Sequence, residues 1–73
     1  MKRIRVDPEG WGDYWWEPHN ERALEELGLE YIKRSYGVLY NIINENLFFL
    51  NAIKHGFTFK EVDESYEVKS KYD

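Results

Sequence analysis

Residues with the chemistry to bind a metal are scarce in this 73-residue chain. His19 and His55 are the only two histidines, and there is no cysteine. Neither histidine lies in a His-x3-His or His-Glu-x-x-His pattern, which would put two ligands on one face of a helix. We therefore expect no metal site, with His19 opening a helix and His55 complementing the negative end of another.

Catalytic nucleophiles and phosphate-binding loops are equally hard to find. No serine lies in a Gly-x-Ser-x-Gly turn, and the five glycines are scattered instead of clustered in one loop. Adjacent carboxylates such as Glu25 and Glu26 point to different sides of a helix, so they do not form an acid–base pair. The sequence predicts a protein that is not an enzyme and has no cofactor.

A cluster of tryptophans is the most unusual feature of the sequence. Trp, Tyr and Phe make up 18% of the chain, and three tryptophans and a tyrosine fall within residues 11–16. On a strand, alternate side chains point to opposite faces, so aromatic rings would occupy both faces while one helix layer covers one. Tyr and Trp dominate the binding energy of protein interfaces. The predicted partner-binding surface is Trp11, Asp13, Tyr14, Trp16 and Glu17, with burial of the same cluster as the alternative.

A second aromatic group follows in residues 36–49. A helix that is apolar nearly all round is either buried or shared with another chain, and a chain this small has little room to bury one. We therefore expect a homodimer or a docked target there. The residues predicted for self-association are Tyr36, Tyr40, Phe48 and Phe49.

Charge is segregated along the chain, whose net charge is −4. Residues 2–5 are basic, whereas residues 7–30 are strongly acidic. An acidic surface suits a basic protein partner, and it disfavours phosphate binding by Lys2, Arg3 and Arg5 beside the tryptophans. Nucleic acid is therefore an unlikely partner, although an acidic mimic of DNA remains an alternative.

In the N-terminal half, polar and apolar residues alternate over 2–6, and Asp7-Pro8-Glu9-Gly10 fits a type I turn. Residues 2–16 are thus predicted to form a hairpin. Asn20 can cap a helix over 20–27, and Gly28 can end it in a left-handed conformation. Residues 29–34 are either a strand or the first turns of a longer helix.

In the C-terminal half, apolar spacing predicts a long helix from Val38 to His55, closed by Gly56. Residues 57–62 and 66–69 then read as two strands of a hairpin, joined by a turn at 63–65.

The predicted fold class is α+β: one domain over residues 1–73, with a single-layer antiparallel sheet of N- and C-terminal hairpins. This sheet packs on one long central helix and one short helix, and the alternative is a helical hairpin flanked by β ribbons. No apolar run approaches the length of a membrane span, and no signal peptide is present, so we expect a cytoplasmic protein.

We expect a protein-binding module that inhibits or modulates a larger protein, with a small structural subunit of an assembly as an alternative. In type, although not in any motif, the chain resembles the small acidic proteins with which phages bind and block host proteins. That resemblance implies an inhibitory role.

Overall fold

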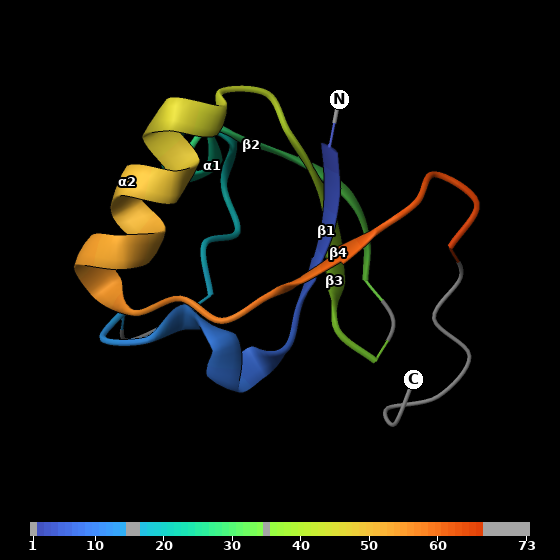
Figure 1. Ribbon diagram of the computed structural model, residues 1–73, viewed down its shortest axis with the longest axis horizontal. Helices are drawn as coiled ribbons and strands as arrows, with labels where there is room; N and C mark the ends of the chain where they lie inside the picture. The colour runs from blue at the N-terminus through green and yellow to red at the C-terminus, as the bar shows by residue number, and fades with distance from the viewer. Residues whose placement is uncertain (1, 15–16, 35, 67–73) are drawn as a thin grey trace.

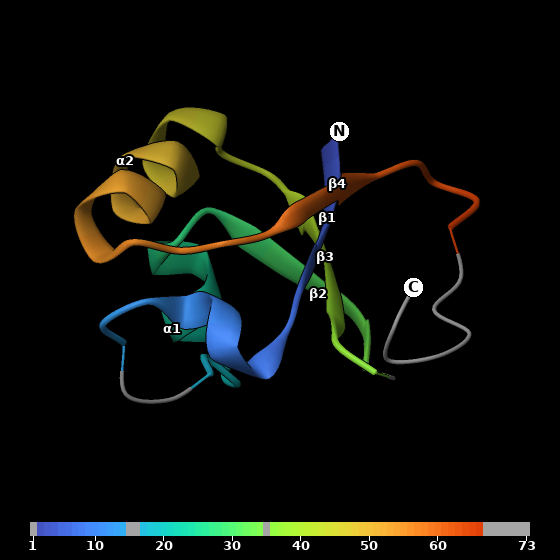
Figure 2. The same cartoon turned by 60° about the horizontal axis from the view of Figure 1, so that its bottom comes forward.

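The computed structural model of the chain describes residues 2–14, 17–34 and 36–66. Four strands form one antiparallel sheet in the order β2-β3-β1-β4, and two helices lie on the same side of it (Figures 1 and 2). The predicted α+β class, with one sheet, one longer helix and one short helix, is confirmed.

The two central strands are β1 (Lys2–Val6) and β3 (Val38–Ile42), which pair with Ile4 opposite Tyr40. The edge strand β2 (Leu29–Arg34) pairs with β3, and the other edge strand, β4 (Lys60–Val62), pairs with β1. A bulge interrupts the β2–β3 register between Tyr31 and Lys33.

Both α-helices begin at an asparagine cap. The Asn20 side chain accepts a hydrogen bond from the Ala23 amide at the start of α1 (Glu21–Glu26). The Asn44 side chain does the same for the Leu47 amide at the start of α2 (Glu45–His55). These bonds satisfy amides that have no acceptor within their helix.

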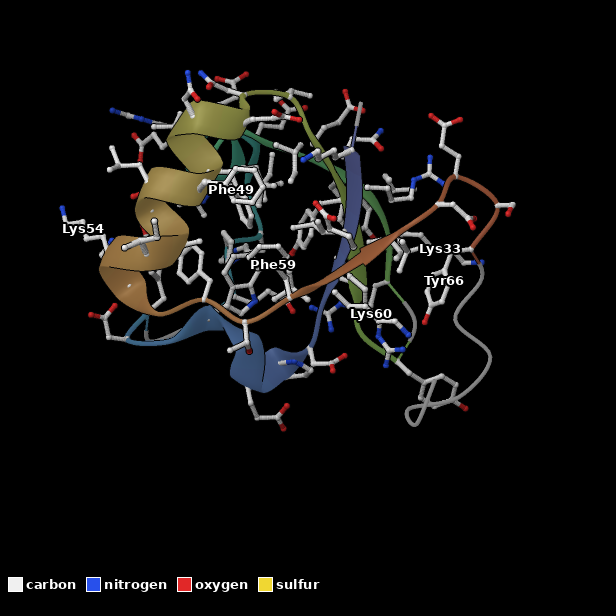
Figure 3. All side chains as sticks on the ribbon, viewed as in Figure 1. Lys33, Phe49, Lys54, Phe59, Lys60 and Tyr66 are labelled. Atoms are coloured by element: carbon white, nitrogen blue, oxygen red, sulfur yellow. The ribbon has the colours of Figure 1, made fainter. Side chains whose placement is uncertain are left out.

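The core lies between the sheet and the helices. β1 and β3 direct alternate side chains into it, and α2 contributes Phe48 and Ala52. A short 3-10 helix, η1 (Pro8–Trp11), closes one end with the buried ring of Trp11. Figure 3 shows Phe49 and Phe59 at the margin of this core, between α2 and the sheet.

The predicted N-terminal hairpin is wrong. β1 pairs with β3 and β4. η1 (Pro8–Trp11) covers the expected turn and the first residue of the expected return strand, and residues 12 and 13 form a turn. Gly12 adopts a φ of 60°, and a side chain there would collide with the His55 carbonyl. The chain therefore turns where extended backbone was expected.

The predicted helix from Val38 to His55 divides into β3 and α2. Val38, Tyr40 and Ile42 alternate toward the core as strand residues, and the helix begins only after the Asn44 cap. The predicted helix over 20–27 and its Gly28 end are confirmed, and of the two alternatives for residues 29–34 the strand is the one that forms. Of the predicted C-terminal hairpin, residues 60–62 form β4, which pairs with β1, and residues 67–69 lie outside the described residues.

Candidate partner-binding groove

Trp11, which was predicted for the partner surface, belongs to the core. Its side chain is 2% exposed and makes edge-to-face contacts with Tyr40 and Phe57, with ring centroids 5.7 and 5.1 Å apart. The argument from strand alternation fails here because Trp11 ends a 3-10 helix. Its Nε1 is a buried donor without an acceptor among the described residues.

The residues after Trp11 fasten this segment to the rest of the fold. Asp13 Oδ1 lies 2.7 Å from His55 Nδ1, and the Asp13 amide donates to the His55 carbonyl. Tyr14 is half-buried and packs edge-to-face on the His55 ring. Glu17 forms an ion pair with Arg34, and Trp16 lies outside the described residues. Asp13, Tyr14 and Glu17 therefore have contacts within the chain itself.

The residues predicted for self-association do not form one surface. Tyr40 and Phe48 are buried, and Phe49 is partly buried against Phe48 and Phe59. Tyr36 is 53% exposed, in the turn between β2 and β3. Tyr40 of β3 and Phe48 of α2 both belong to the core between the sheet and the helix, so neither can form part of a contact surface.

The structure instead forms a groove between α1 and the edge strand β2. The groove encloses about 440 Å³. Its lining residues are His19, Glu21, Leu24, Glu25, Leu29, Glu30, Tyr31 and Ile43. Three of these residues are glutamates and none is a lysine or arginine, so the groove is acidic over an apolar floor.

Local backbone geometry places α1 beside β2. Gly28 has a φ of 71°, which allows the chain to reverse directly from α1 into β2. Its carbonyl accepts hydrogen bonds from the Ile43 and Asn44 amides at 2.8 and 3.2 Å. These bonds hold the start of α2 against the end of α1, and they bring Ile43 to the groove.

The groove follows the free edge of β2. Leu29 and Tyr31 lie on one face of the strand and Glu30 on the other, yet all three line it. The Ile43 amide donates to the Gly28 carbonyl, next to the first β2–β3 pair, Leu29 and Ile42. By antiparallel alternation the backbone groups of Leu29 and Tyr31 point away from β3.

The sequence showed that residues 7–30 are acidic, but it did not show which of these glutamates would line one groove. Glu21, Leu24 and Glu25 are three and four residues apart, so they share one face of α1. Glu30 is held by Asn41, whose amide donates to Glu30 Oε1 at 3.1 Å. The reversal at Gly28 brings Glu30 to the groove lining, but its carboxylate lies with Asn41 on the other face of the strand.

The basic residues considered for nucleic acid do not converge. Lys2 lies on the side of the sheet that faces the helices, where its Nζ is over the Phe49 ring. The same Nζ is 3.9 Å from Glu45 Oε1 and 3.6 Å from Glu61 Oε1. Arg3 and Arg5 lie on the opposite face of the sheet. Arg3 donates to the Glu64 carbonyl.

Arg5 is 3% exposed and bonds Asp7 and the Tyr66 hydroxyl. Burial lowers the pKa of Arg5, but the Tyr66 hydrogen bond and the Asp7 charge outweigh it and raise the pKa overall. A pocket of about 250 Å³ beside Arg5 is lined by Asp7, Thr58, Phe59 and Lys60. Figure 3 places Lys33, Lys60 and Tyr66 on this side of the sheet, away from α2. The Arg5 charge is therefore satisfied within the fold.

Within residues 2–14, 17–34 and 36–66, no three histidine, aspartate or glutamate side chains are grouped to hold a metal ion. No helix in that part of the chain is long and apolar enough to cross a membrane. Comparison of the chain with protein families, with curated proteins and with solved structures found no match. The groove geometry is therefore the basis for a functional proposal.

Proposed function

We propose that the protein is a non-enzymatic protein-binding module that takes a basic segment of a larger protein into the groove between α1 and β2. The supporting observation is the lining of the groove: the α1 residues Glu21 and Glu25 lie beside an apolar floor that includes Leu24 and Ile43. Carboxylates around an apolar floor select a segment that carries both lysine or arginine and aliphatic side chains.

An extended segment fits this groove better than a helix. The outward backbone groups of Leu29 and Tyr31 can pair with an added strand, as in other complexes that extend a sheet at its edge. The bulge after Tyr31 limits regular pairing to residues 29–31. Binding would therefore depend on charge and on side chains in the groove as much as on backbone pairing.

A module of this kind would act by occupying a basic segment that its target uses elsewhere. This is the inhibitory or modulating role expected from the sequence. An acidic protein that imitates DNA would also meet basic targets, but it would bind a folded basic surface and no isolated extended peptide. The two proposals therefore differ in a measurable way.

The test uses a fluorescein-labelled peptide of ten alternating lysines and valines, with a glutamate–valine peptide as its counterpart. Fluorescence anisotropy should detect binding of the basic peptide alone, and the affinity should fall as salt rises. Glu25→Lys should weaken binding by about three- to tenfold, because it replaces an attraction by a repulsion. Glu9→Lys is the matched control, since Glu9 is exposed on η1 outside the groove.

Equal binding of the two peptides would contradict the proposal, as would equal losses in the Glu25→Lys and Glu9→Lys variants. Resonances of residues 29–31 should shift in a heteronuclear NMR titration. A shift confined to other strands would place the peptide elsewhere and overturn the groove assignment.

A further inference from the structure

The outer face of α2 carries the most exposed aliphatic side chains among the described residues. Ile53 is 84% exposed and Leu50 is 66% exposed, and Ile43, just before the helix, is 49% exposed. Leu47 is half-buried beside them. At 100° per residue, Leu47, Leu50 and Ile53 fall on one side of the helix axis, opposite Phe48 and Ala52, and Ile43 precedes the helix at its N-terminal end. We call these four residues the outer stripe.

The outer stripe has opposite charges at its two ends. Lys54 lies at the C-terminal end and points away from the sheet in Figure 3. Ile43 lies at the N-terminal end, where it lines the groove with Glu21 and Glu25. A surface that is apolar in the middle, positive at one end and negative at the other is complementary to itself when turned by 180°.

We propose that two copies of the chain associate through their outer stripes, with the two α2 helices antiparallel about a twofold axis at Leu50. This arrangement packs Leu50 on its own copy and sets Ile53 opposite Leu47 of the second chain. Lys54 then comes beside the N-terminal end of the second α2, within reach of its Glu21 and Glu25. Closed twofold dimers are the commonest form of self-association in soluble proteins.

The charge pattern favours a second copy over a different partner. A parallel pair of helices would bring Lys54 against Lys54, and like charges oppose association. The antiparallel pair matches each charged end with its opposite, using residues that this chain itself supplies. The stripe therefore contains both halves of a symmetric interface.

Sedimentation equilibrium at 5–500 µM tests the assembly. A mass near twice the 8.9 kDa of the chain is expected at the upper end of this range. Leu50→Asp should raise the Kd of the dimer roughly 30-fold or more, because it buries a charge at the centre of the contact. Tyr36→Asp is the matched control: Tyr36 is 53% exposed and lies outside the stripe, so the Kd should not change.

Circular dichroism of Leu50→Asp should match that of the parent chain, because the Leu50 side chain is mostly outside the core. A parent chain that remains monomeric at 500 µM would overturn the proposal. So would a Leu50→Asp variant that dimerises as the parent does.

Cysteine cross-linking tests the geometry, since the chain has no cysteine of its own. Leu50→Cys should form an intermolecular disulfide under mild oxidation. A mixture of Leu47→Cys and Ile53→Cys chains should form the mixed disulfide in preference to either symmetric one. Preferred symmetric disulfides at both positions would indicate parallel helices and contradict the antiparallel arrangement.

A charge exchange separates this proposal from peptide binding in the groove. Lys54→Glu and Glu25→Lys should each weaken the dimer by about two- to fivefold, and the double variant should recover the parent affinity. Lys54→Glu should leave affinity for the lysine–valine peptide unchanged when both are measured in the monomeric Leu50→Asp background. Additive losses in the double variant would overturn the charge pairing, whatever the peptide result.

Discussion

The two sides of α2 differ more than any other neighbouring regions of this protein. On the inner side, Phe48 is fully buried and Ala52 is 7% exposed, whereas on the outer side Leu50 and Ile53 are 66% and 84% exposed. Both sides are apolar and belong to one helix of 11 residues. Residue type alone therefore does not decide which side packs on the sheet.

The comparison shows how limited the core of a small chain is. Rings from η1, α2 and the segment between α2 and β4 meet in it: the ring centroids of Phe48 and Phe59 are 5.0 Å apart, and those of Trp11 and Phe57 are 5.1 Å apart. Once these rings fill the space beneath the sheet, the remaining aliphatic residues of α2 have no room there. Substitutions on the inner side should lower folding stability, and those on the outer side should change association.

The largest effect is expected for Phe48→Ala, which removes a ring at the centre of the inner side. The loss should be about 3–5 kcal/mol in the free energy of unfolding, the usual cost of truncating a buried aromatic residue. Urea denaturation followed by circular dichroism measures it. A loss below 1 kcal/mol would mean that the inner side is not the packed side.

Trp11→Ala tests whether the Trp11 ring of η1 belongs to the same core as Phe48. The same loss of about 3–5 kcal/mol is expected, because the Trp11 ring contacts both Tyr40 and Phe57. Binding of the lysine–valine peptide, measured where the variant is still folded, should not change. A specific loss of peptide binding with unchanged stability would return Trp11 to the partner surface.

Alkaline pH should lower the free energy of unfolding through Tyr40, a buried residue of β3 in the same core. Burial raises the pKa of Tyr40 to about 12, although the nearby Arg34 charge acts in the opposite direction. Because the ordinary pKa is near 10, the stabilisation is complete below pH 10 and is lost as the pH rises through 12. The loss should approach about 2–3 kcal/mol.

The free energy of unfolding between pH 8 and pH 12 measures this loss, with Tyr40→Phe as the control. The control cannot ionise at this position, so its stability should decline less steeply with pH. Identical pH profiles for the two proteins would contradict the assignment.

Asn44→Ala should cost about 1 kcal/mol, because it removes the side chain that accepts from the Leu47 amide at the start of α2. Asn46→Ala provides the matched comparison, since Asn46 is exposed in the first turn of the helix. Thermal melting of both variants should separate them. Equal melting temperatures would mean that the cap does not stabilise α2.

The smallest effect is expected on the outer side. Ile53→Ala should change the stability of the dilute monomer by less than about 0.5 kcal/mol, as is usual for exposed positions. The measurement belongs at low micromolar concentration, where association contributes least. A loss above 2 kcal/mol would show that Ile53 packs within its own chain.

The sequence by itself determined the local elements that carry their own stop signals. Asn20 and Gly28 define α1, alternation defines β1, and Gly56 ends α2 with a φ of 73°. Each of these depends on backbone preferences and hydrogen bonds over a few residues, so no distant contact is needed to predict it. The α+β class follows from the same elements.

Only the tertiary structure decided which side of each element is covered. The apolar residues of 38–42 have spacings compatible with a helix, but this segment forms β3, which lies between β1 and β2 in the sheet and pairs with both. Trp11 is buried because the chain turns at Gly12 against the His55 carbonyl, a contact between residues far apart in the sequence. The spacing of apolar residues along the chain shows that an element has an apolar face. Whether that face is buried depends on where the sheet lies relative to the element.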